Sequence, residues 1–301
     1  MNTYGRVRAR DLDGIVMQAK EHLERVGAQP DLRLVQYVAN RFIIERIMGD
    51  DWSERNLYPP NGRYLRFEFD YDEEGLYRYE HKITSLAGVL YDVQGLDHVE
   101  DRLSRLDGVD IEPTLAELSV VSILRSSGTP TFLRPESEGG YEADLVLDDG
   151  APATLEVKCK IETTAELTEG GLLTRLKKAR DQVPDDRPAM VWLRLQAHWM
   201  HTQAAADLLT KTVQSFLRNT GRISAVIPFY EWAVPGWALP VAELSESNPS
   251  LTGHVTRQIL FENPRARHSP ESFWRVFYRL ARLPDRPTML LDAVSRAMAG
   301  A

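Results

Sequence analysis

The chain has 301 residues, 43% of them hydrophobic, and a formal net charge of −8 at pH 7. This length and composition predict a folded protein with a sizeable core, arranged as one large or two ordinary domains. The negative charge excludes binding of nucleic acid through bulk positive charge, so such binding requires a local basic patch. The single cysteine, Cys159, excludes an internal disulfide and a cysteine-based metal cage.

The start of the chain and its most apolar stretch bear on the compartment. The first residues contain no apolar signal region. The most apolar long stretch, residues 223–244, is interrupted by three prolines and by acidic residues, which makes it a poor membrane span. We therefore expect a cytoplasmic protein with no membrane partner.

Residues 1–110 predict a mostly helical N-terminal region. Apolar residues recur at helical spacing in residues 12–27 and 31–49, each of which ends at a glycine, and again in residues 76–95. Residues 62–75 alternate between polar and apolar and predict a short strand or an extended loop. We expect this region to select a target or to bind a protein partner.

The pattern changes in residues 111–235, where short strands alternate with helices. A three-stranded meander followed by alternating units predicts a mixed sheet with helices on both faces, which is an α/β class core in a chain that is α+β overall. Residues 236–301 predict a C-terminal extension packed on the core, with two helices at 269–283 and 288–300. The expected core elements, in chain order, are a helix at 112–128, strands at 129–136, 141–149 and 153–161, a helix at 170–183, a strand at 189–196, a helix at 203–221 and a strand at 222–232.

Two of these strands carry acidic residues and a lysine. Alternate residues of a strand share a face, so Glu156 and Lys158 point one way while Cys159 points into the core as a small hydrophobe. On the preceding strand Glu142 and Asp144 share a face. If the strands pair through the turn between them, Asp144 and Glu156 converge. Two carboxylates form an all-oxygen site for a hard cation, Mg²⁺ or Mn²⁺, and a lysine beside it can help to deprotonate an attacking water.

The triplet of an acid, any residue and a lysine is by itself a weak pattern. Glu80, His81 and Lys82 form a second such triplet, which lies on a predicted helix with no acidic strand before it. The triplet at Glu156 differs in its context, because it lies on an apolar strand that follows an acidic strand and precedes an amphipathic helix.

In this context the chain resembles the PD-(D/E)XK nuclease superfamily, which has the restriction-endonuclease-like fold. The matching residues are Asp144 and the segment from Glu156 to Lys158, within an α-β-β-β-α-β order that covers about residues 111–230. The motif acid is preceded by Ala143 rather than by the proline of the family name.

The resemblance implies roles for individual residues. Asp144 and Glu156 look like Mg²⁺ ligands, and Lys158 like the lysine that assists the attacking water. Many members of the family place a further acid on the first core helix, and Glu117 fits that position. We therefore expect Glu117, Asp144 and Glu156 to form one acidic cluster, in which at least one carboxyl pKa is raised.

Three further polar residues are candidate contacts to a substrate. Lys160 follows Lys158 on the same face of its strand, and Lys178 and Gln182 share a face of the next helix. In the family, polar residues of that helix often approach the site or the substrate phosphates. A solvated helix face is the open alternative for Lys178 and Gln182.

Two functions remain open from the sequence. The first is a metal-dependent nuclease (a hydrolase) that acts on DNA more readily than on RNA, a function favoured by the complete set of Asp, Glu and Lys together with Glu117. The second is a catalytically inactive interaction or nucleic-acid-binding protein that keeps the fold, a function slightly favoured by the acidic charge.

Overall fold

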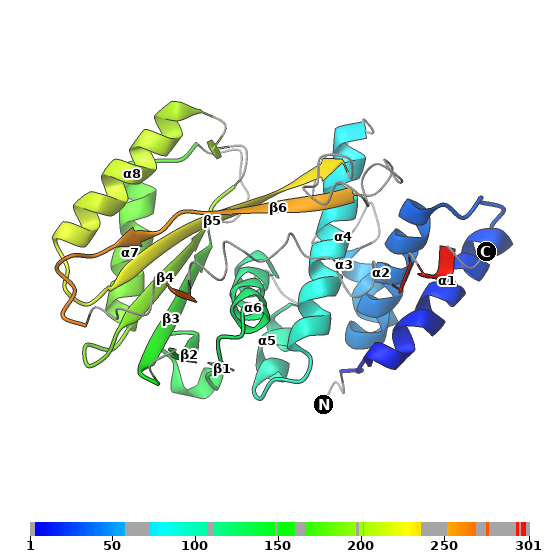
Figure 1. Cartoon of the computed structure of the whole chain (residues 1–301), viewed down its shortest axis with the longest axis horizontal. Helices are drawn as coiled ribbons and strands as arrows, with labels where there is room; N and C mark the ends of the chain where they lie inside the picture. Colours follow the sequence, from blue (N-terminus) through cyan, green and yellow to red (C-terminus); the bar gives the residue numbers. More distant parts are fainter. Residues whose placement is uncertain are drawn as a thin grey trace. The chain divides into compact units, whose positions relative to one another are not determined.

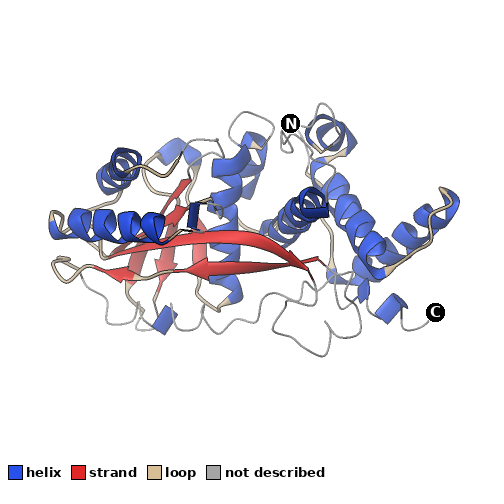
Figure 2. Ribbon diagram, turned by 90° about the horizontal axis from the view of Figure 1, so that it is seen from above, coloured by secondary structure: helices blue, strands red, loops and turns tan. Residues whose placement is uncertain are grey.

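The computed structural model describes residues 4–57, 73–106, 111–147, 150–159, 166–196, 199–200, 202–235 and 252–268, with short pieces at 275–276, 293–294 and 296–298. Figure 1 follows the chain by colour and Figure 2 by secondary structure. The chain divides into two compact units: Met1–Gln94 with Trp232–Val255 and Pro284–Ala301, and Gly95–Glu231 with Thr256–Leu283. The expected boundaries at residues 110 and 235 stay a prediction.

The first unit contains a bundle of helices, three of which the sequence predicts. Helix α2 packs against both α1 and α4, and their buried faces carry Ile15, Ile44 and Leu86. The side chain of Asp31 accepts a hydrogen bond from the backbone N–H of Leu34 (2.7 Å), which caps the start of α2. The helices are α1 (Leu12–Arg25), α2 (Leu32–Met48), the unexpected α3 (Asp50–Asn56) and α4 (Glu73–Val93), preceded by the 3-10 turn η1 (Ala9–Asp11).

Polar residues join α2 to α4 inside this bundle. The Arg33 guanidinium donates from Nε to both carboxylate oxygens of Glu80 (2.9 and 2.7 Å), and Asn40 donates to the Thr84 hydroxyl (3.0 Å). Glu80 is buried. The second acid-x-lysine triplet of the chain therefore uses its glutamate in a buried ion pair between two helices.

The second unit is built around a mixed sheet, two strands of which include residues assigned to the first unit. In the part of the chain that the structure describes, this sheet has seven strands in the order β1-β2-β3-β4-β5-β6, with β7 paired to β5. β1, β2 and β3 form an antiparallel meander, and β3, β4 and β5 are parallel. The strands are β1 (Thr131–Leu133), β2 (Ala143–Val146), β3 (Pro152–Cys159), β4 (Ala189–Arg194), β5 (Ala225–Pro235), β6 (Thr252–Gln258) and β7 (Phe261–Glu262).

Helices alternate with these strands and cover the sheet. The order α6-β1-β2-β3-α7-β4-α8-β5 confirms the predicted order of core elements and the mixed sheet. α7 and α8 lie on one side of the sheet and α6 on the other (Figure 1). The helices are α5 (Val99–Arg105), α6 (Ile111–Ser126), α7 (Glu169–Gln182) and α8 (Gln203–Arg218), with a 3-10 turn η2 (Glu136–Glu138).

Strand alternation decides which residues meet which helix layer. Val191 and Leu193 of β4 pack with Leu172 and Leu176 of α7 in one buried cluster. Trp192 lies between them in sequence, is fully buried and points to the opposite face. α6 is buried along nearly its whole length, as a helix that is apolar on most sides requires.

Several expectations differ from the structure or lie outside it. The sequence did not predict α5, nor the strands β6 and β7 within the C-terminal extension. Most of segment 62–75 and most of the two C-terminal helices fall outside the described residues. In the ranges that the structure describes, no helix is both long and apolar enough to cross a membrane.

Candidate active site

The register of the β2–β3 hairpin decides which carboxylate meets Glu156. Asp144 pairs with Thr154, and Ala143 pairs with Leu155. Glu142, the residue before β2, donates its backbone N–H to the carbonyl of Leu155 (2.9 Å). Glu142 therefore lies beside the end of the hairpin where Glu156 lies, and Asp144 lies one step further from it.

Asp144 has other partners than those expected. Its carboxylate accepts a hydrogen bond from the Tyr141 hydroxyl (2.9 Å) and lies 3.8 Å from the Arg187 guanidinium. Its side chain is 41% exposed. Asp144 therefore contacts Tyr141 and Arg187, and Glu142 lies nearer than Asp144 to the level of Glu156 along the hairpin. The convergence of Glu117, Asp144 and Glu156 stays a prediction.

Glu156 and Lys158 lie on one face of β3, as strand alternation predicts. Their register partners on β4 are Val191 and Leu193, which point toward α7. The Glu156 side chain has no exposed surface, and its Oε1 forms an ion pair with Nζ of Lys158. Its Oε2 is buried and has no hydrogen-bond partner among the described residues. A buried acceptor without a partner is unusual and indicates a missing ligand, water or proton.

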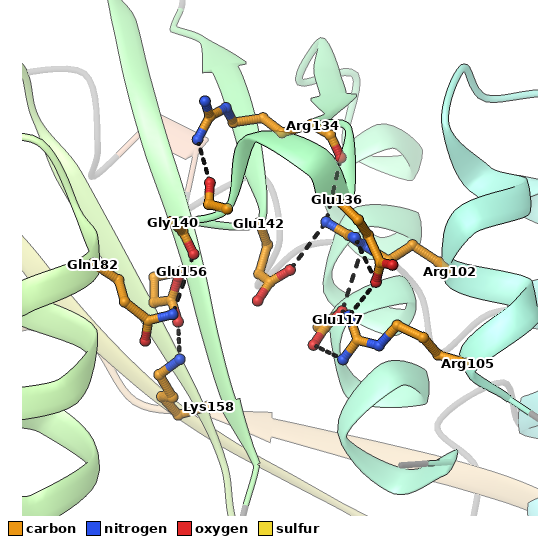
Figure 3. Close-up of polar contacts among 11 residues, drawn as sticks. Arg102, Arg105, Glu117, Arg134, Glu136, Gly140, Glu142, Glu156, Lys158 and Gln182 are labelled. Carbon is orange, nitrogen blue, oxygen red and sulfur yellow. Dashed lines mark hydrogen bonds and ion pairs between the residues drawn. The ribbon is translucent and has the colours of Figure 1, made fainter. Parts of the chain in front are cut away.

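Glu117 projects from α6 into a network of arginines. Arg105 donates two hydrogen bonds to its carboxylate (3.1 Å each), and Nε of Arg102 lies 3.6 Å from it. Arg102 also reaches Glu136 (3.1 Å) and Glu142 (3.3 Å). Figure 3 shows Glu142 between this arginine network and the pair of Glu156 and Lys158.

Electrostatic interactions link these carboxylates, although α6 with Glu117 lies on the side of the sheet opposite the α7 face that carries Glu156. Burial raises the pKa of Glu156 to about 8, Lys158 partly offsets this, and the negative charges of Glu142 and Glu117 raise it further. Burial likewise raises the pKa of Glu117 to about 7, the charge of Glu142 raises it further, and Arg105 and Arg102 oppose both effects. We call Glu117, Glu142 and Glu156 the acid cluster.

The acid cluster has the type of ligand that a hard cation prefers, but its carboxylates are not grouped in threes. Carboxylate oxygens are the ligands that Mg²⁺ and Mn²⁺ prefer, and the unpartnered Oε2 of Glu156 is one of them. However, among the described residues no three acidic, histidine or cysteine side chains are close enough together to hold a metal ion. Arg102, Arg105 and Lys158 instead supply the positive charge beside the carboxylates.

The remaining candidates have different surroundings. Gln182 donates its side-chain N–H to the carbonyl of Gly140 (3.2 Å), and its Oε1 is buried with no hydrogen-bond partner among the described residues. Lys178 is exposed on α7, and Lys160 lies outside the described residues. Burial raises the pKa of Cys159 to about 11, so its thiol is protonated near neutral pH and is no nucleophile.

Sequence reasoning missed three residues of this site. Glu142 was assigned to the same strand face as Asp144, so alternation allowed either acid and only the register chose. Arg102 and Arg105 lie on α5, whose helical signal is the spacing of Val99, Leu103 and Leu106, all of them buried. A single short helix of this kind is easily overlooked.

The raised pKa values predict how stability depends on pH. A carboxyl whose pKa is higher in the folded state stabilises the fold fully below its unfolded pKa, and this contribution is lost as pH rises through the folded pKa. In metal-free buffer the melting temperature should therefore fall between about pH 5 and pH 8.5. Glu156→Gln should flatten this slope, because the amide does not titrate, whereas Asp144→Asn should keep it. A wild-type melting temperature that does not change over this range would contradict the assignment.

Comparison with known proteins gives no match: no family model, no curated protein and no solved structure is significantly similar to this chain. The assignment of a function therefore rests on the side chains of the acid cluster and on the elements that hold them.

Proposed function

We propose that this protein is a metal-dependent nuclease of the PD-(D/E)XK type, with Glu142 rather than Asp144 as the motif acid. The observation that carries the proposal is the group of Glu142, Glu156 and Lys158 at one end of the β2–β3 hairpin, with Glu156 fully buried. The order of elements around the hairpin agrees with the resemblance, since a helix precedes the meander and a helix and strand follow it.

The proposed site would hold Mg²⁺ or Mn²⁺ through Glu142 and Glu156, with Glu117 as a further acid nearby. The cation would supply Lewis-acid chemistry, which stabilises the charge that develops on a phosphodiester during attack. The ammonium of Lys158 would hold the attacking water and stabilise the hydroxide that forms as the water passes its proton to solvent. The ammonium of Lys158 is already oriented by Oε1 of Glu156, so it needs little reorganisation.

The burial of the acid cluster supports a functional role. A buried carboxylate with a raised pKa costs stability near neutral pH, and such groups are concentrated at catalytic and ligand sites. A divalent cation would offset this cost by favouring the charged carboxylates. The unpartnered Oε2 of Glu156 is the oxygen that gains most from such a cation.

The proposed substrate is nucleic acid, with DNA favoured over RNA because of the resemblance to the restriction-endonuclease-like fold. Lys178 and Gln182 of α7 are candidate contacts to it, together with Lys160. The helical first unit would select the target or bind a protein partner. A cytoplasmic location, without a membrane partner, belongs to the same proposal.

One observation favours a second function. Arg102 and Arg105 already pair with Glu117 and Glu142, so the carboxylates have positive charge beside them without a metal ion. This protein would then be catalytically inactive and would bind nucleic acid or a protein, and the network would serve the stability of the fold. The two functions differ in whether the protein binds a divalent cation and cleaves.

Replacing Glu142 and Asp144 one at a time tests which of the two is the motif acid. The register of the structure favours Glu142, and the sequence favoured Asp144. Glu142→Gln should weaken Mn²⁺ binding and reduce cleavage by at least about 100-fold. Loss of a residue that merely supports a metal ligand costs about 10- to 100-fold, and loss of the ligand itself should cost at least as much. Asp144→Asn should keep both, since Asp144 contacts Tyr141 and Arg187. Calorimetric titration with Mn²⁺ and cleavage of single- and double-stranded DNA and RNA would measure the two effects.

Both variants conserve the shape of the side chain, and their melting temperatures would show that each is folded. The reverse result, in which Asp144→Asn loses metal and cleavage and Glu142→Gln keeps them, would restore Asp144 as the motif acid. Wild-type protein that binds no Mn²⁺ or Mg²⁺ at millimolar concentration and cuts no substrate would exclude the enzyme and leave the second function.

Replacement of the lysine tests its role at the attacking water. Lys158→Met should keep the cation ligands and lower the rate of cleavage by about 10²–10³-fold, the usual cost of removing one preorganised donor that stabilises developing charge. The variant leaves Glu156 buried without its cation, so metal-free protein should melt at a lower temperature and added Mn²⁺ should recover part of the loss. A Lys158→Met protein that binds Mn²⁺ and still cuts at the wild-type rate would remove the lysine from the reaction.

A further inference from the structure

Arg102 is the most deeply buried cation of the second unit for which the structure gives ion pairs. Its side chain is 4% exposed and extends from the short helix α5. A buried guanidinium is costly unless its donors are paired with acceptors. The partners of Arg102 should therefore show what this charge is for.

The guanidinium joins segments that are distant in sequence. It forms ion pairs with Glu117 on α6 (3.6 Å), Glu136 on η2 (3.1 Å) and Glu142 beside β2 (3.3 Å). It also donates to the backbone carbonyl of Arg134 (3.3 Å), as Figure 3 shows. Arg102 thus holds two members of the acid cluster at once.

The contact with Glu142 is specific to one oxygen. Arg102 donates to Oε2 of Glu142, and among the described residues Oε1 of Glu142 accepts no hydrogen bond. Glu156 also has one oxygen held by a cation, since Lys158 pairs with its Oε1. Its Oε2 is buried without a partner among the described residues, whereas the Glu142 side chain is 12% exposed and leaves its other oxygen to solvent or to a ligand.

We propose that Arg102 is a positioning residue that orients the Glu142 carboxylate toward a divalent cation shared with Glu156. The inference rests on the proposed function and extends the site to α5. A planar guanidinium fixes a carboxylate more firmly than a point charge does, because its donors have a fixed geometry. Partners that hold a ligating carboxylate typically contribute 10- to 100-fold to metal affinity.

Arg105 provides a matched control on the same helix. It lies one turn after Arg102, bonds Glu117 with two hydrogen bonds and pairs with Glu136 (3.1 Å). Among the described residues it makes no hydrogen bond or ion pair with Glu142. The two arginines share the same network, and they differ in their contact with the proposed cation ligand.

The experiment compares Arg102→Gln, Arg102→Lys and Arg105→Gln with the wild-type protein. Mn²⁺ affinity is titrated calorimetrically, and cleavage is followed as Mn²⁺ is raised to saturation. Arg102→Gln should bind Mn²⁺ about 10- to 100-fold more weakly, and saturating Mn²⁺ should restore most of its cleavage rate. Arg102→Lys should lie between Arg102→Gln and wild type, and Arg105→Gln should lose less Mn²⁺ affinity than Arg102→Gln, because it leaves the contact of Arg102 with Glu142 in place.

Melting temperatures in metal-free buffer separate orientation from stability. Should Arg102→Gln unfold at the assay temperature, Arg102→Lys carries the same comparison with Arg105→Gln. Equal Mn²⁺ affinities for the Arg102 and Arg105 variants would overturn the inference and leave the proposed nuclease intact. Tighter Mn²⁺ binding by Arg102→Gln would also overturn it, because Arg102 would then compete with the cation. A wild-type protein that binds no Mn²⁺ would remove the proposed function and the inference together.

Discussion

The second unit depends on neutralising carboxylates that its fold buries. Glu117 and Glu156 are nearly or fully inaccessible to solvent, and such charges cost several kcal/mol each unless they are paired or protonated. Arg102, Arg105 and Lys158 supply the opposite charge from α5 and β3. Because the arginines come from a helix outside the meander, α5 has to pack against α6 for the network to close. The charge balance of the acid cluster thus constrains the arrangement of elements around the sheet.

The same balance explains why one site supports two functional interpretations. The raised pKa values of Glu117 and Glu156 show that the cations beside them do not fully offset burial. In a nuclease, a divalent cation would neutralise the remaining negative charge of the carboxylates. In a protein without a metal ion, partial protonation would neutralise it. The buried Oε2 of Glu156, which no described residue bonds, is compatible with either outcome, because a bound cation and a proton on that carboxyl would each remove the cost of an unpaired buried charge.

The first unit shows how little an acid-x-lysine triplet means without its environment. Glu80 has the same sequence spacing to a lysine as Glu156, and it too is buried. On α4, however, both of its carboxylate oxygens accept hydrogen bonds from Arg33, so its charge is neutralised by an ion pair between two helices. On β3, Glu156 pairs with Lys158, and among the described residues its other charged neighbours are carboxylates. The difference lies in the structural neighbours, and these decide whether a buried acid stabilises a helix pair or marks a site.

The sequence by itself determined the order of the core elements and the sides of β3, because helical and strand periodicity are local properties. It therefore put Glu156 and Lys158 on one face and Cys159 on the other, whereas Glu117 on the helix before the meander was implied by the resemblance to the nuclease superfamily. Tertiary structure placed Glu142 at the level of Glu156 and Asp144 near Arg187, since register depends on contacts across the hairpin. It also brought in Arg102, whose role depends on carboxylates 15 to 40 residues away, which no local pattern can reveal.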